Sequence, residues 1–426
     1  MLIQQESDVT VKTGEDAMTA NAAGRYATAL FELAKSEGAA AAVEADLAAL
    51  RAMLNESDEL AGVLASPLHS ADAKTGILAA LAKKAEFNPL TGNALGVVAH
   101  NGRAGELDDV ARVYAALAAA DFGFAMSAIN SHNVALRLSL SAPAALRDAH
   151  LPGILSGRVS ACTALTEPGA GSDFAAIRTT ARKQGQGWVL NGEKTWIVNG
   201  RHAGLAIVFA QSAEIGDARG IGGFLVDLTR PGVTRHTIDS GFAQTSMGTG
   251  GFTLHAVAVP DDALLLPPGS AFKTILGEIN GARTYVAAMC NAMLRTALDD
   301  VLIYGAQRNS FGKPLIDHDS WRAPLDAADI ALTASVAVTE TAIRQIQTGQ
   351  DAQLAAARAK IGAVENCQQH LPALLHAMGA EGLRPTRCFT RHLAAAQIAG
   401  LTDGATGLLR DRVARLTRTE PRQKEE

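Results

Sequence analysis

The chain has 426 residues, of which 48% are hydrophobic and 19% charged, and its formal net charge is −5. Because single cores stop growing near ~250–300 residues, we expect two or three cores. The basic residues are scattered and the net charge is negative, which argues against a nucleic-acid-binding surface. No apolar run reaches the ~18–20 residues that a membrane-spanning helix needs, so we expect no membrane span.

The cysteines and histidines exclude two further classes of site. The chain has four cysteines, far apart and without a CxxC pair: Cys162, Cys290, Cys367 and Cys388. Reduced thiols in the cytoplasm are the simplest interpretation of that spacing. The 11 histidines show no HxxxH or HExxH pairing, so we predict no metal site.

The first part of the chain has a helical pattern. Residues 1–21 lack the cationic-then-apolar order of a secretory signal, and we expect a disordered leader there. Apolar side chains then recur on one helical face, at Val43, Leu47, Leu50, Met53 and Leu54. Ser70 stands where an N-cap would precede another helix.

After residue 105 the pattern changes twice. A helix from Leu107 to Ala120, and two more before Leu151, are expected in 106–158. Short β-branched segments separated by Gly, Asn and Pro then predict a small sheet or barrel over 159–267. Long Ala- and Leu-rich helices return over 268–418, and a charged tail follows at 419–426. The predicted class is α+β and mostly α.

The segment with the most chemical information begins at residue 161. PGAGS at 168–172 offers bare backbone amides and a hydroxyl, which suit an anion such as a pyrophosphate. Trp196 follows on an expected strand, where an indole can pack on a ring system. The alternative is a surface turn followed by a core tryptophan, because Gly-rich turns are common.

These residues also carry a family resemblance. TEPGAGSD at 166–173 and LNGEKTWIVNG at 190–200 resemble the middle-domain signature of the acyl-CoA dehydrogenases, and INGAR, RNSFGKPL, MGAEG and TDGAT continue the match. The resemblance covers about 106–418 and implies a C-terminal four-helix bundle with bound FAD. It places Thr166, Gly171, Ser172 and Trp196 at the flavin and at the mouth of the acyl-CoA site. Ser172 and Arg283 would contact substrate.

The resemblance further implies a homodimer or homotetramer, because Arg308 and Phe311 of RNSFG would reach the FAD of a neighbouring subunit. The implied reaction is α,β-desaturation of an acyl-CoA thioester, with electrons passed to electron-transfer flavoprotein. The base must be a carboxylate whose pKa is raised by burial in an apolar pocket.

The position of the base follows from two alignments, one on the final helix and one counted forward from Gly382. Both place it at Asp403, where most relatives have Glu and a subgroup has Asp. The alternative is that Asp403 only begins the last helix, as Asp often does. A second base position used by a few relatives falls on Ala282, which cannot serve.

Several positions depart from the family pattern. A glutamine that contacts the adenine side of FAD in the family falls on His376. The remaining departures are Val198 for Thr, Asn280 for Asp, Ala394 and Ala395 for an Arg-Asp pair, and Ala405 for Thr. A buried hydrogen bond contributes ~1 kcal/mol, so several losses together would loosen FAD.

The front of the chain resembles a different family. RYATALFELA, the SPLHSADAK segment and the ending NALGVVAHNGR, within 22–105, resemble the N-terminal helical domain of the ATP synthase delta subunit. That domain binds the N-terminal helices of the ATP synthase α subunits, which implies the same partner here. The alternative is a likeness of composition among Ala- and Leu-rich helices.

Three functions therefore remain open from the sequence. The first is an FAD-dependent acyl-CoA dehydrogenase, and the second is a flavin oxidase of the same fold with Asp as its base. The third is a delta-like binding module with a degenerate flavoprotein body.

Overall fold

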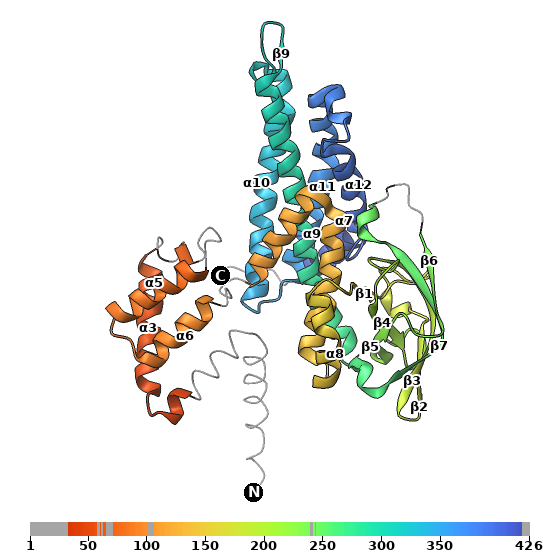
Figure 1. The fold of residues 1–426 in the computed structure, drawn as a ribbon. Helices are drawn as coiled ribbons and strands as arrows, with labels where there is room; N and C mark the ends of the chain where they lie inside the picture. The colour runs from red at the N-terminus through yellow and green to blue at the C-terminus, as the bar shows by residue number, and fades with distance from the viewer. Residues whose placement is uncertain are drawn as a thin grey trace. The chain divides into compact units, whose positions relative to one another are not determined.

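The computed structural model describes residues 33–57, 60, 63–64, 71–100, 106–238, 242 and 244–419. The expected leader, Ser70 and most of the expected tail lie outside these residues. The chain forms two compact units, Met1–Val110 and Ala111–Glu426. Each unit is described below by itself (Figure 1).

The first unit is helical, with α3 (Ala40–Glu56), α5 (Ala71–Lys84) and α6 (Pro89–His100). Val43 and Leu50 of the predicted face are buried, whereas Leu47 is 41% exposed. Asn88 precedes α6, and its side-chain oxygen accepts a hydrogen bond from the Leu90 amide at 3.0 Å. Asn88 is therefore the N-cap of α6, and Pro89 is its first residue. Both residue types are favoured at these positions.

Most of α7 (Glu106–Ser141) belongs to the second unit, and α8 (Ala144–Leu155) follows it. At Asp121 the backbone of α7 leaves helical geometry (φ −153, ψ 102), so the predicted helix ends near Ala120 and a second begins after it. The Asp121 carboxylate accepts from the Phe124 amide at 3.0 Å and from the Ser246 hydroxyl at 2.7 Å. Asp121 thus caps the second half of α7 and ties it to the sheet domain.

By length and composition, Val110–Ser141 within α7 qualifies as a membrane-spanning helix, with a mean hydropathy of 1.3, although 39% of that window is buried in this structure. A helix that covers the core of a folded protein meets the same test. Its inner residues Val134 and Leu138 belong to the core of the sheet domain.

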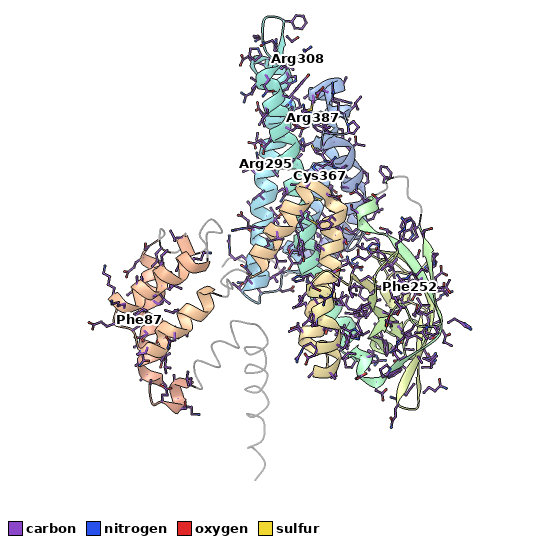
Figure 2. All side chains as sticks on the ribbon, in the orientation of Figure 1. Phe87, Phe252, Arg295, Arg308, Cys367 and Arg387 are labelled. Carbon is purple, nitrogen blue, oxygen red and sulfur yellow. The ribbon has the colours of Figure 1, made fainter. Side chains whose placement is uncertain are left out.

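The sheet domain has eight strands: β1 (Ala161–Ala164), β2 (Thr180–Gln184), β3 (Gly187–Ile197), β4 (Leu205–Gln211), β5 (Ile221–Asp227), β6 (Val233–Thr237), β7 (Gly250–Pro260) and β8 (Leu264–Leu266). Their order is β6-β7-β3-β2-β4-β5-β8, with β1 parallel to β4. The sheet is open among the described residues, so of the two expected forms the sheet is confirmed and the barrel is not. Its core includes Phe252, labelled in Figure 2.

Five helices complete the second unit: α9 (Ala271–Gln307), α10 (Asp319–Gln347), α11 (Gln353–Met378), α12 (Phe389–Ala399) and α13 (Thr406–Thr419). α9, α10 and α11 run side by side (Figure 1). A hairpin, β9 (Asn309–Ser310) and β10 (Lys313–Pro314), joins α9 to α10 at one end of this bundle. The expected sequence of helices, sheet and helices is confirmed.

Candidate active site

The Gly-rich turn at 167–172 is anchored by a buried ion pair that sequence reasoning missed. Lys194 on β3 is fully buried, and its ammonium donates to the Glu167 carboxylate at 2.7 Å and to the Leu165 carbonyl at 3.0 Å. Glu167 also accepts from the amides of Arg178 and Thr179. Burial lowers the pKa of Lys194 to about 8, against the opposing effect of Glu167. These contacts therefore join the two sequence motifs, TEPGAGSD and LNGEKTWIVNG, to each other.

The outer side of this turn is open. Gly171 and Ser172 are exposed, and a Cβ added at Gly171 would meet no atom within 4 Å. Within the described part of the chain, the amides of these two residues have no hydrogen-bond partner. Amides without a partner beside a hydroxyl suit an anion, so the anion-binding surface at this turn stays a prediction. The Thr166 carbonyl accepts from the Thr195 amide at 3.1 Å, which places this turn beside Trp196.

Trp196 lies at the end of β3 with φ 57 and 58% of its surface exposed. The alternative of a core tryptophan does not describe this side chain. Three residues later, Asn199 is fully buried with φ 64. Its side-chain amide donates to the carbonyls of Ser127 and Ala161, both at 2.9 Å, so it ties this segment to α7. The Asn-Gly pair at 199–200 was the available signal for such a buried turn.

Asp403 lies in the turn between α12 and α13 rather than in α13, which begins at Thr406. Its φ is 48, and the following Gly404 has φ 97. Burial raises the pKa of the Asp403 carboxyl, while the nearby cations Lys360 and Arg283 oppose that rise. The Asp403 amide donates to no acceptor in the described part of the chain. The turn therefore presents a carboxyl of raised pKa and a free amide on one residue.

Arg283, from α9, is 5% exposed and binds the turn that contains Asp403. Its Nε donates to the Asp403 carbonyl at 3.1 Å, and its Nη1 donates to Asn280 Oδ1 at 3.0 Å. Asn280 thus supplies an acceptor for Arg283 although the family's aspartate is absent. Burial lowers the pKa of Arg283 to about 10.

Lys360, on α11, is a second residue at this turn that sequence reasoning missed. Its ammonium is fully buried and donates to carbonyls on both sides of Asp403. A lysine within the apolar, Ala-rich stretch QLAAARAKIGA was the signal that could have found it, since an unpaired lysine is almost never buried.

The remaining predicted residues lie elsewhere in the bundle. Arg308, at the end of α9, is exposed, and Phe311 in the hairpin is 96% exposed with φ 48 (Figure 2 labels Arg308). At 1.5 Å per residue, Arg308 lies about 38 Å along α9 from Arg283. His376 is exposed on α11, about 24 Å along that helix from Lys360 by the same rise. One subunit therefore does not bring these three residues to Asp403.

Comparison with known proteins finds family matches for three segments of the chain. Residues 162–257 match the family "Acyl-CoA dehydrogenase, middle domain", and residues 269–417 match "Acyl-CoA dehydrogenase, C-terminal domain". Residues 162–257 and 269–417 therefore resemble two successive domains of the acyl-CoA dehydrogenase family. Residues 22–133 match "ATP synthase delta (OSCP) subunit", which extends into α7.

Individual relatives show the same division. The ATP synthase delta subunit of Maricaulis maris is 79% identical over 106 residues, which are 25% of this chain and 59% of that protein. The human mitochondrial short-chain specific acyl-CoA dehydrogenase is 31% identical over 255 residues, covering 60% of this chain and 62% of the human one. The butyryl-CoA dehydrogenase of Megasphaera elsdenii shares the fold, with a TM-score of 0.68 at 23% identity over 88% of this chain and 98% of that one. The chain thus spans about 60% of the curated relatives it matches.

Proposed function

We propose that this protein catalyses the FAD-dependent α,β-dehydrogenation of an acyl-CoA thioester and passes the electrons to electron-transfer flavoprotein in the cytoplasm. The observation that supports this most directly is Asp403, whose carboxyl has a pKa raised by burial and whose amide has no acceptor among the residues that the structure describes. It lies within the region that matches the dehydrogenase C-terminal domain.

The residues of the sheet domain suit FAD. The open amides at Gly171 and Ser172 would hold the pyrophosphate or another anionic group, and the exposed indole of Trp196 offers a flat face for the isoalloxazine ring. The hydroxyls of Thr166 and Ser172 would add polar contacts at the flavin and at the acyl-CoA mouth. FAD, when bound, supplies the acceptor for the substrate's β-hydrogen as hydride.

The chain's own contribution is proton removal and charge stabilisation. Asp403 would take the α-proton of the thioester, which requires the ionised carboxylate. The raised pKa makes that carboxylate a stronger base near neutral pH than an exposed Asp. The free amide of Asp403 would donate to the thioester oxygen and stabilise the developing enolate charge. Arg283 would act through the turn, because its guanidinium already binds Asp403 and Asn280.

The distance between the two groups of predicted cofactor residues supports a homodimer or homotetramer. Arg308 lies about 38 Å along α9 from Arg283, and His376 lies about 24 Å along α11 from Lys360, the two cations that bind the turn of Asp403. A second subunit would bring its own Arg308, Phe311 and His376 to the FAD held near Asp403. Burial of the nearly fully exposed Phe311 ring would favour such an assembly.

An absorbance experiment tests this function. Purified protein should show a flavin spectrum, and adding acyl-CoA thioesters of different chain lengths without oxygen should bleach it near 450 nm. Electron-transfer flavoprotein should then reoxidise the enzyme. A colourless protein that does not take up FAD, or a flavin that no thioester bleaches, would contradict the proposal.

The delta-like front favours a second, separate function: docking on the ATP synthase α subunit through residues 22–105. The 79% identity over 106 residues supports it. A peptide with the N-terminal helix of the α subunit should retain the full-length protein on a column, and a scrambled peptide should not. Equal retention by both peptides, or by neither, would argue against this function.

A further inference from the structure

The base lies on a turn whose backbone is bound by two cations from two different helices. Lys360 Nζ donates to the Thr402 carbonyl and, at 2.5 Å, to the Gly404 carbonyl. Arg283 Nε donates to the carbonyl of Asp403 between them, at 3.1 Å. Three consecutive carbonyl groups are therefore fixed by α11 and α9.

The conformation of the turn explains why such fixing is needed. Asp403 has φ 48, a left-handed conformation that costs a non-glycine residue free energy unless its surroundings impose it. Gly404 follows with φ 97, and a Cβ there would lie 3.5 Å from Arg283 Nη2. Hydrogen bonds from the two cations hold this conformation in place.

The cost of burying Lys360 also requires an explanation. An ammonium loses several kcal/mol of hydration when it is buried, and two neutral carbonyls return only part of that. A hydrophobic residue on α11 would fill the same space without this cost. The nearby negative charge is that of Asp403, which stabilises the Lys360 ammonium.

We propose that Lys360 is a positioning residue for proton abstraction: it holds the 402–404 turn in its left-handed conformation and keeps Asp403 in the ionised form. This inference rests on the proposed function of Asp403 as base. Lys360 touches the backbone of the turn and acts on the reaction through Asp403.

The charges around the turn give the expected direction of the effect. Asp403 faces Lys360 on α11 and Arg283 on α9, and both cations lower its pKa against the effect of burial. Lys360 itself has its pKa lowered to about 8 by burial, with Asp403 and Cys290 raising it and Arg283 lowering it. On α13, Arg412 acts on Arg283 in the same direction as burial. Removing the Lys360 charge should therefore raise the pKa of Asp403.

The first test measures that carboxyl directly in the full-length protein. Carbon-13 NMR of aspartate-labelled protein, with Asp403→Asn identifying the signal, gives the titration midpoint of Asp403 without any substrate. In Lys360→Met the midpoint should rise by about one pH unit, as expected for the loss of one close opposite charge. Lys360→Gln, which keeps a donor but no charge, should show the same rise. The control Lys183→Met removes an exposed lysine on β2 and should leave the midpoint unchanged.

A second measurement needs no substitution of Lys360, in case those variants do not fold. In lysine-labelled protein, the midpoint of Lys360 should fall when Asp403→Asn removes the neighbouring charge. Unchanged midpoints in either titration would overturn the proposal.

Anaerobic flavin reduction completes the test. With acyl-CoA, the rate of flavin reduction falls as the pH is lowered, and in Lys360→Met this fall should occur at higher pH, by the same interval as the NMR midpoint. Lys360→Arg should restore most of the wild-type dependence of the rate on pH. A fall that stays at the wild-type pH in Lys360→Met would overturn the role of Lys360. If the wild-type flavin is not bleached at all, the proposed function fails, while the NMR titrations still decide whether Lys360 and Asp403 are coupled.

Discussion

At the scale of single residues, Asp403 combines three properties in one turn. Its backbone is left-handed, the pKa of its carboxyl is raised, and its amide has no acceptor in the described part of the chain. None of these would be needed if Asp403 only began the last helix, which starts three residues later at Thr406. An N-cap immediately precedes its helix, so the position of Asp403 does not fit that role, and its role as base stays a prediction.

Asp403→Asn keeps the size of the side chain and removes the base. We expect the rate of flavin reduction by acyl-CoA to fall by about 10²–10⁴-fold, the usual contribution of a general base. Anaerobic stopped-flow absorbance measures this rate. The flavin content of the purified variant is the control and should match that of the wild type, whereas retained turnover would show that another group is the base.

At the scale of elements, β3 is attached to the Gly-rich turn through a buried charge pair. Lys194→Met would leave the Glu167 carboxylate buried without its partner, so we expect the sheet domain to lose about 3–5 kcal/mol of stability. Urea unfolding followed by tryptophan fluorescence of Trp188 and Trp196 measures this change. In the matched control, Lys183→Met breaks the exposed pair with Asp261 and should change stability by less than about 1 kcal/mol.

A buried histidine on α12 makes the stability of the folded protein depend on pH. His392 on α12 is fully buried, and burial, together with Arg391, lowers its pKa to about 4 from 6.5. The unfolded chain therefore binds more protons than the folded one between these values, so stability is lost as the pH falls from 6.5 towards 4. The loss amounts to about 3 kcal/mol at most.

Replacement of this histidine tests the sign. In His392→Phe, the free energy of unfolding measured at pH 7 and at pH 4.5 should differ by about 2 kcal/mol less than in the wild type. Any effect of repacking the ring that does not depend on pH cancels in this difference between the two pH values. If the difference is the same in the variant and in the wild type, other groups cause the loss of stability in acid.

At the scale of the whole molecule, the β9–β10 hairpin gives the clearest evidence on assembly. Phe311 in this hairpin is 96% exposed, and Arg308 lies at the end of α9, where the hairpin begins (Figure 2). We expect Arg308→Ala to lower flavin content and the fraction of oligomer together, because one side chain would serve both. Light scattering after gel filtration and the ratio of flavin to protein absorbance measure the two quantities. Normal values of both would count against a cross-subunit role.

The front and the rest of the chain resemble different families. Residues 22–133 resemble a delta subunit and residues 162–417 a dehydrogenase, and the relatives on each side are matched over only about 60% of their lengths. Each unit has buried core residues of its own, such as Leu50 and Val43 in the first and Phe252 and Leu138 in the second. Separate cores are what the length predicted, since one core rarely serves more than about 300 residues.

The sequence by itself determined the order of helices, sheet and helices and both family resemblances, and it predicted Asp403 as the base. These depend on local periodicity and on residues at fixed spacings, such as TEPGAGSD and TDGAT, which one stretch of chain carries alone. Even the break in α7 was visible, because the predicted helix ends at Ala120.

Only the tertiary structure decided which side chains meet. Lys194 and Glu167 are 27 residues apart, and Lys360 lies 42 residues before Thr402, whose carbonyl it binds. No local pattern specifies such contacts, because they arise when β3 pairs into the sheet and α11 packs against α9 and α13. Whether the sheet closes depends likewise on strand order, which is a property of the folded domain.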